Sequence, residues 1–171
     1  SSSEIGLGHL MRCLTLAHEL KQQGYYVTFL CRELVGNFIS LIKHPVLILP
    51  KDNDFQSDDL YLDRLGATQK QDAEQTINLI PKGTDVLIVD SYALDEAWHK
   101  KLRLHIKKIV VIDDLADKKF DCDILLNQNF GAQEGYYKHK VSCDCKLLLG
   151  CEYALLRPEF AELRAQAIEK R

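Results

Sequence analysis

Six short, continuous apolar runs recur along the chain, and they constrain its fold more than any other feature. Each run is rich in Val, Ile and Leu and lacks the polar alternation of a strand with one face in water. The runs are YYVTFLC, PVLILP, DVLIVD, KIVVIDD, DCDILLN and CKLLLG. Most are separated by segments of helical composition, so the pattern predicts an α/β fold. We expect three layers, with helices covering both faces of a parallel sheet.

The segments between the runs give the expected helices. An amphipathic helix is predicted from Gly8, with Gly24 as its stop. Further helices are expected over residues 94–106 and over TQKQDAEQTINLI. The acidic segment KDNDFQSDDLYLDRLG is predicted to be either a surface excursion or a short helix. RPEFAELRAQAIEKR is predicted to be a charged helix leading away from the domain, with Pro158 in its first turn.

Length and charge exclude several classes of protein. The chain has 171 residues, of which 46% are hydrophobic and 27% charged, and this suits one globular domain with its own core. A net charge of −3 leaves no basic excess for a nucleic acid, and no segment reaches the apolar length of a membrane span. No signal peptide precedes the first helix. We therefore expect a cytoplasmic protein that binds neither nucleic acid nor membrane.

Six cysteines lie mostly inside or beside apolar runs, as buried, reduced thiols do. Cys122, Cys143, Cys145 and Cys151 could be assembled into a zinc site. However, the sequence has no C-x-x-C pair, and the spacing matches no common ligand pattern. We expect ordinary packing for these side chains, and neither a metal nor another cofactor.

The segment IGLGHLMR places Gly6, Gly8 and His9 at the entrance of the first helix. The free N–H groups and the dipole of a helix N-terminus attract anions, and glycine lets a ligand approach the backbone closely. A phosphate-bearing substrate is therefore predicted. Met11 stands where a dinucleotide fingerprint needs its third glycine, which disfavours a nicotinamide site. Residues 1–5 are too short and polar to be a central strand, so we expect the first strand to precede them.

His9 is predicted to be a general base. The helix N-terminus disfavours a protonated imidazole, so the ring is expected to be neutral near pH 7 and able to accept a proton. Arg12 follows three residues later on the same face, where it could bind a carboxamide, hydroxyl or phosphate of the substrate. The remaining histidines are expected to be structural or solvated; they are His18, His44, His99, His105 and His139.

Polar residues follow three of the apolar runs. Asp90, Ser91 and Tyr92 follow DVLIV, Asp113 and Asp114 follow KIVVI, and Asn127 ends CDILLN with Asn129 close behind. Ligands bind at the carboxyl ends of parallel strands, so these residues and the glycine loop are predicted to form one substrate-binding rim. Each also has a structural alternative: the carboxylates could cap helices, Tyr92 could cover the core edge, and Asn127 could form a turn.

These motifs resemble a known family. The blocks IGLGHLMRCLTLA, QDAEQT, DVLIVDSYALDEAWH, VVIDDLADKKFDCDILLNQN and LLLGCEYALLRPEF stand in the order found in the PseG family. Members are hydrolases of UDP-2,4-diacetamido-2,4,6-trideoxy-β-L-altropyranose in the bacterial pseudaminic acid pathway. The resemblance extends over nearly the whole chain. It implies that His9 is the catalytic residue and that Tyr92 lies at the substrate site.

The resemblance also implies a domain organisation. The family is of the GT-B type, related to the MurG glycosyltransferases, with two Rossmann-like domains and an active site between them. Residues 1–155 would form the N-terminal domain and residues 156–171 the start of the connector. The C-terminal domain, which would make most of the contacts with UDP, is absent from this chain. The fragment alone is therefore expected to be inactive, and its oligomeric state is not predicted.

The implied reaction releases UDP from a UDP-sugar by cleavage of the anomeric C–O bond, and two alternatives stay open. A GT-B glycosyltransferase needs the same loop and base, and differs only in whether an acceptor hydroxyl or water attacks. The DSY, IDD and YALLRPEF blocks favour the hydrolase. A sugar-binding half-domain without turnover would also fit a chain that lacks the nucleotide-binding half.

Overall fold

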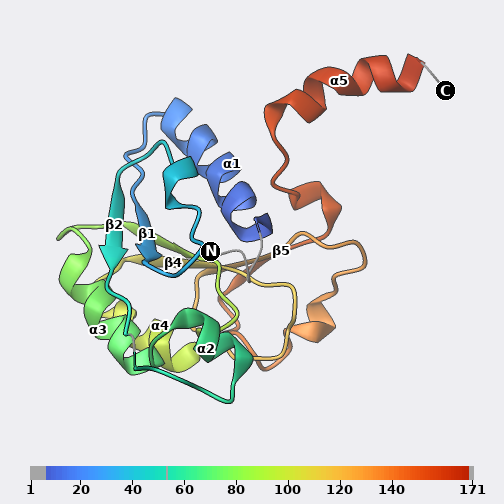
Figure 1. Ribbon diagram of the computed structural model, residues 1–171. Helices are drawn as coiled ribbons and strands as arrows, with labels where there is room; N and C mark the ends of the chain where they lie inside the picture. Colours follow the sequence, from blue (N-terminus) through green and yellow to red (C-terminus); the bar gives the residue numbers. More distant parts are fainter. Residues whose placement is uncertain (1–6, 53, 170–171) are drawn as a thin grey trace.

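The computed structural model describes residues 7–52 and 54–169 (Figure 1). All six predicted strands form within this part of the chain, one in each apolar run. They are β1 (Phe29–Arg32), β2 (Val46–Leu49), β3 (Val86–Val89), β4 (Lys108–Ile112), β5 (Ile124–Asn127) and β6 (Lys146–Leu149).

Every strand pairing is parallel, so the predicted α/β class is confirmed. The order β3-β4-β5-β6 makes a four-stranded sheet, and β1 pairs with β2 in a separate ladder. Within the described residues no ladder joins β1 to β3, so the strands divide between two sheets. The strand expected ahead of the first helix falls outside the described residues.

The helices also follow the predicted segments. They are α1 (Gly8–Gln22), α2 (Leu60–Leu65), α3 (Gln69–Leu79), α4 (Glu96–Arg103) and α5 (Pro158–Glu169). The acidic segment thus contains a short helix, which Asp59 caps by accepting from the N–H groups of Tyr61 and Leu62. Thr68 opens α3 with a capping box, and the side chain of Asp95 caps α4.

The core lies between the four-stranded sheet and α3 and α4. In Figure 1, α1 lies on one side of the strands and α3 and α4 on the other. Trp98 and Leu102 of α4 are buried against Ile109 of β4 and Leu125 of β5. Burial of these large apolar side chains supplies most of the stabilisation, at about 25 cal/mol for each Å² removed from water.

A buried polar network ties the β1–β2 pair to the helices. Arg32 ends β1, and its Nη2 donates to Oδ2 of Asp72 in α3 over 2.7 Å. Its Nη1 donates to the carbonyl of Pro50, and Trp98 Nε1 donates to Oδ1 of Asp72 over 2.9 Å. Both charged side chains are at most 4% exposed, so each depends on the other to offset its lost hydration.

The C-terminal helix α5 leads away from the other elements (Figure 1). Leu156, Phe160 and Leu163 are more than half exposed, as expected of a segment outside the core. The division at residue 155 stays a prediction. Among the described residues, none of the helices combines the length and the apolar character that crossing a bilayer requires.

Candidate active site

A histidine and a carboxylate meet where α1 begins and β3 ends. His9 is the second residue of α1, and Asp90 directly follows β3. His9 Nδ1 lies 2.5 Å from Asp90 Oδ1, and the side chains of the two residues are 14% and 3% exposed. The ring therefore lies at the partly open edge of the strands and not in the apolar interior.

This contact assigns the tautomer of the imidazole. Arg12 Nη2 lies 3.2 Å from Nδ1 but donates to Asp90 over a shorter distance, and a carboxylate oxygen can only accept, so the contact favours the tautomer in which Nδ1 donates to Asp90. Nε2 is then left as the acceptor of the ring, and among the described residues it has no hydrogen-bond partner. An imidazole held in this way by a carboxylate is the arrangement that general bases of hydrolases use.

Arg12 holds the same carboxylate from its other side. Its Nε donates to Asp90 Oδ2 over 2.6 Å, and its Nη2 donates to Oδ1 over 2.5 Å. Burial alone would raise the pKa of Asp90, but the hydrogen bonds from Arg12 and His9 outweigh it and hold that pKa below its usual range. Asp90 is therefore a fixed anion against which His9 is oriented.

A second carboxylate stands next to Arg12. Asp114, in the loop after β4, places Oδ2 3.6 Å from Arg12 Nη1. Its Oδ1 is buried and has no hydrogen-bond partner among the described residues. A buried acceptor without a donor is costly, so this oxygen is a natural site for an N–H or O–H group of a ligand.

Aromatic rings surround the free face of this cluster. The ring of Tyr92 meets that of His9 edge to face, with centroids 4.7 Å apart, and Tyr61 of α2 lies 5.4 Å beyond it. Lys118 Nζ donates to the carbonyl of Tyr92 and lies over the ring of Tyr61. Burial and the nearby Asp114 carboxylate raise the pKa of Tyr92, so its hydroxyl stays protonated.

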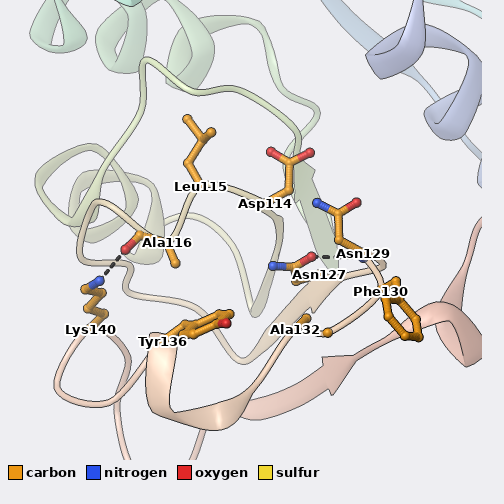
Figure 2. A pocket seen from close by; sticks show the side chains of 10 residues that line it. Asp114, Leu115, Ala116, Asn127, Asn129, Phe130, Ala132, Tyr136 and Lys140 are labelled. Atoms are coloured by element: carbon orange, nitrogen blue, oxygen red, sulfur yellow. Dashed lines mark hydrogen bonds between the residues drawn. The ribbon is translucent and has the colours of Figure 1, made fainter.

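A pocket of about 410 Å³ opens beside Asp114 (Figure 2). Asn127 and Asn129 contribute amide groups to its lining, and Phe130 and Tyr136 contribute rings. Aromatic faces with a few polar groups are typical of sites for sugars and other small polar ligands. Asp114 lines the pocket and also lies 3.6 Å from Arg12, so it is the residue that the pocket and the His9 cluster share.

Asp113 and Asn127 both contact Tyr137, and Asn127 also lines the pocket. Both are buried, and both bond to the hydroxyl of Tyr137: Asn127 Nδ2 donates to it over 3.0 Å, and it donates to Asp113 Oδ2 over 2.9 Å. Asp113 also accepts from the Ala116 N–H. This network fixes the loop after β4 to the segment after β5, which forms the wall of the pocket.

The structure thus brings four of the predicted site residues into one cluster: His9 and Arg12 both bond to Asp90, and Tyr92 packs against His9. Gly8 lies one residue before His9, and a Cβ added at this position would meet no atom within 4 Å. Gly6 lies outside the described residues. The guanidinium of Arg12 is engaged by Asp90 and Asp114, where the sequence predicted a substrate contact.

Two side chains beside Tyr92 are not among the predicted site residues. They are Tyr61, from the acidic segment, and Lys118, from the block VVIDDLADKKFDCDILLNQN, and only their place in the fold brings them beside Tyr92. Across residues 7–52 and 54–169, no cluster of three or more His, Cys, Asp or Glu side chains has a geometry that could hold a metal ion.

The resemblance to the PseG family is confirmed by comparison with known proteins. The chain is 33% identical, over 173 aligned residues, to the UDP-2,4-diacetamido-2,4,6-trideoxy-β-L-altropyranose hydrolase of Campylobacter jejuni subsp. jejuni. The match takes in 100% of this chain and 54% of that protein. No protein-family model matches the chain.

A second similar protein comes from the archaeon Methanocaldococcus jannaschii and is uncharacterized. It is 25% identical over 172 residues, which cover 99% of this chain and 32% of that protein. The chain therefore spans about half of the hydrolase and about a third of the archaeal protein, and is consistent with an N-terminal half of the hydrolase.

Proposed function

We propose that this chain carries the catalytic half of a hydrolase that releases UDP from a UDP-linked 2,4-diacetamido-2,4,6-trideoxy sugar. The observation that carries the proposal is the His9–Asp90 pair, in which a buried carboxylate orients an imidazole whose Nε2 is free. The reaction and substrate are those in the name of the similar hydrolase from Campylobacter jejuni.

In this scheme His9 Nε2 takes a proton from the water that attacks the anomeric carbon. Nδ1 stays bonded to Asp90, and the carboxylate stabilises the imidazolium that forms. Arg12 keeps Asp90 ionised and fixed. Direct displacement by one water leads to inversion at the anomeric carbon.

The leaving group explains why one base is enough. Glycosidases need a second carboxyl group, because an alkoxide leaving group must be protonated. UDP leaves as a stabilised anion, so the main tasks are to hold the sugar, orient the water and remove its proton. The N-terminal amides of α1 near Gly8, which no N-cap side chain satisfies, favour the diphosphate.

In this proposal the pocket beside Asp114 would hold the sugar. The free Oδ1 of Asp114 would accept from an amide N–H or a hydroxyl of the sugar, and Asn129 would bond to the acetamido groups. Tyr92 packs against His9 and lies near Asp114, so it would position the anomeric carbon near the base. Tyr61 would flank the sugar from α2.

In this proposal the nucleotide is bound mainly by a domain that lies outside this chain. Residues 1–155 would form the sugar-binding and catalytic domain, and residues 156–171 would begin the connector to a UDP-binding domain. The scheme runs on side chains and backbone groups of the protein alone. The 171-residue chain by itself is expected to turn over little or no substrate.

The test is hydrolysis of the UDP-sugar in ¹⁸O-water by the whole protein, with no acceptor present. We expect free sugar that carries the label, since water attacks carbon. Label in the phosphate would mean attack at phosphorus, and would contradict the scheme. Turnover only after addition of an acceptor would identify a glycosyltransferase, and binding without UDP release would identify a binding module.

A variant pair ties the activity to His9. His9→Ala should lower kcat by about 10²–10⁴-fold, which is the usual contribution of a general base. His18→Ala is the matched control, because His18 lies exposed on the same helix and bonds only to Gln22. Equal turnover of the two variants would remove His9 from the mechanism.

A further inference from the structure

Two cysteines face each other at the end of the sheet remote from the candidate active site. The Sγ atoms of Cys122 and Cys145 lie 3.6 Å apart, and both thiols are free. Cys122 stands two residues before β5 and Cys145 directly before β6. The backbone fixes them there, because Lys146 N–H donates to the carbonyl of Asp123 over 2.9 Å.

We propose that Cys122 and Cys145 form a thiol pair that closes to a disulfide when the protein meets a disulfide oxidant such as oxidised glutathione. The bond needs the two sulfur atoms to approach from contact distance to about 2.05 Å. The two residues sit at the ends of neighbouring strands, so side-chain rotation and a small shift of the Cys145 loop can achieve this.

The burial of the two thiols sets the order of the steps. Cys145 is partly exposed and Cys122 is only 3% exposed, so the oxidant reaches Cys145 first. The Cys145 thiolate attacks one sulfur of oxidised glutathione, and one glutathione thiolate leaves. Cys122 then loses its proton and attacks the Cys145 sulfur, which releases the second glutathione. Two protein thiols are oxidised, and one glutathione disulfide is reduced to two thiols.

The electrostatics of the pair agree with this order. The hydrogen bond between the two thiols lowers the pKa of the Cys145 thiol. The same hydrogen bond, together with burial, raises the pKa of Cys122. Cys145 is therefore the nucleophile and Cys122 the thiol that resolves the mixed disulfide.

The other cysteines lack such a partner or such access. Cys143 and Cys151 are exposed, in contrast to the expectation of buried thiols, and neither has a sulfur neighbour among the described residues. Cys13 and Cys31 are partly buried, and burial raises the pKa of both thiols. The thiol of Cys13 also donates to Asp90, so both are poor nucleophiles. The reaction should therefore be specific for one pair.

The crosslink would enclose the segment that builds the pocket wall. Residues 123–144 include β5, Asn127 and the loop that carries Phe130 and Tyr136. The disulfide would restrict this segment in the unfolded chain and so stabilise the folded one. The His9–Asp90 pair lies at the opposite ends of the strands, so this inference is independent of the proposed reaction.

The experiment uses peptide mapping of the whole protein after incubation with excess oxidised glutathione. Trypsin places Cys122 in the peptide 120–138 and both Cys143 and Cys145 in the peptide 141–146. We expect these two peptides to be joined in the unreduced digest, with a mass two hydrogens below their sum. We also expect the melting temperature of the oxidised protein to rise, and the rise to vanish on reduction.

Two variants identify the sulfur atoms. Cys143→Ser removes the exposed neighbour and should leave the crosslink intact, while Cys145→Ser should abolish it. A crosslink that persists in Cys145→Ser, or is lost in Cys143→Ser, overturns the proposal. So does a wild-type digest in which the two peptides stay separate, whether as free thiols or as glutathione adducts.

Discussion

His9 and Asp90 are 81 positions apart in the sequence, yet His9 Nδ1 and Asp90 Oδ1 lie 2.5 Å apart. The contact joins the start of α1 to the end of β3, and Arg12 closes it by bonding to both oxygens of the carboxylate. The orientation of the base therefore depends on the packing of α1 against the end of the sheet. A side chain that never touches the substrate can control the reaction in this way.

Asp90→Asn tests that control. The amide keeps the size of the carboxylate but can present its NH₂ group to Nδ1, which favours the wrong tautomer and occupies Nε2 with the hydrogen. We expect kcat for UDP release to fall by about 10²–10⁴-fold, while KM changes little. Steady-state kinetics on the whole protein measure both.

The matched control for this variant is Asp85→Asn. Asp85 precedes the same strand, but its carboxylate is exposed and pairs with Lys107 at the surface. This variant should keep wild-type kcat. If Asp90→Asn keeps it too, or if combining it with His9→Ala gives the product of the two single losses, the two residues do not act as a unit.

Gly8→Ala tests the approach of the diphosphate to α1. A Cβ at this position meets no atom within 4 Å, and Gly8 needs no left-handed backbone conformation. The fold should therefore be kept, with a melting temperature equal to or above that of the wild type. The added methyl group would stand where an anion approaches the amides, so we expect KM to rise roughly tenfold, or about 1.4 kcal/mol. An unchanged KM would place the diphosphate elsewhere.

The apolar runs predicted the strands because burial on both faces leaves a continuous hydrophobic signal. KIVVIDD became β4, and the glycine that stops the first helix stands just beyond Gln22. The separation of β1 and β2 from the other strands could not be predicted, because run composition does not specify which strands are neighbours.

The sequence predicted where the site lies but not which of its side chains bond to one another. The rule that ligands bind at carboxyl ends of strands led to Asp90 and Tyr92. It could not tell that Asp90 would bind His9 and Arg12, or that Asp113 would turn inward to Tyr137, because these depend on side-chain directions. Tyr61 carries no sequence signal, because it comes from an acidic segment that the sequence left open between a surface excursion and a short helix.

Asp72→Asn tests the buried network between β1 and α3. The amide can still accept from Trp98, but it leaves the buried guanidinium of Arg32 without its counter-charge. We expect the free energy of unfolding to fall by about 3–5 kcal/mol, measured by urea denaturation. Asp85→Asn removes an exposed pair and should change the free energy of unfolding little. Similar losses for both variants would argue against the importance of burial.

His99 makes stability depend on pH in a predictable direction. The ring is fully buried beside Trp98 and Phe120, and in the part of the chain that the structure describes neither nitrogen has a hydrogen-bond partner. Burial lowers its pKa from 6.5 to about 4. As pH falls below 6.5, His99 becomes protonated in the unfolded chain but stays neutral in the folded protein, so it should remove about 2 kcal/mol of stability between pH 7 and pH 5.

His99→Leu should flatten that decline in stability, whereas His105→Ala, at an exposed site, should leave it unchanged. Urea titrations at both pH values measure the difference, and equal slopes for wild type and His99→Leu would show that the buried ring is not its source.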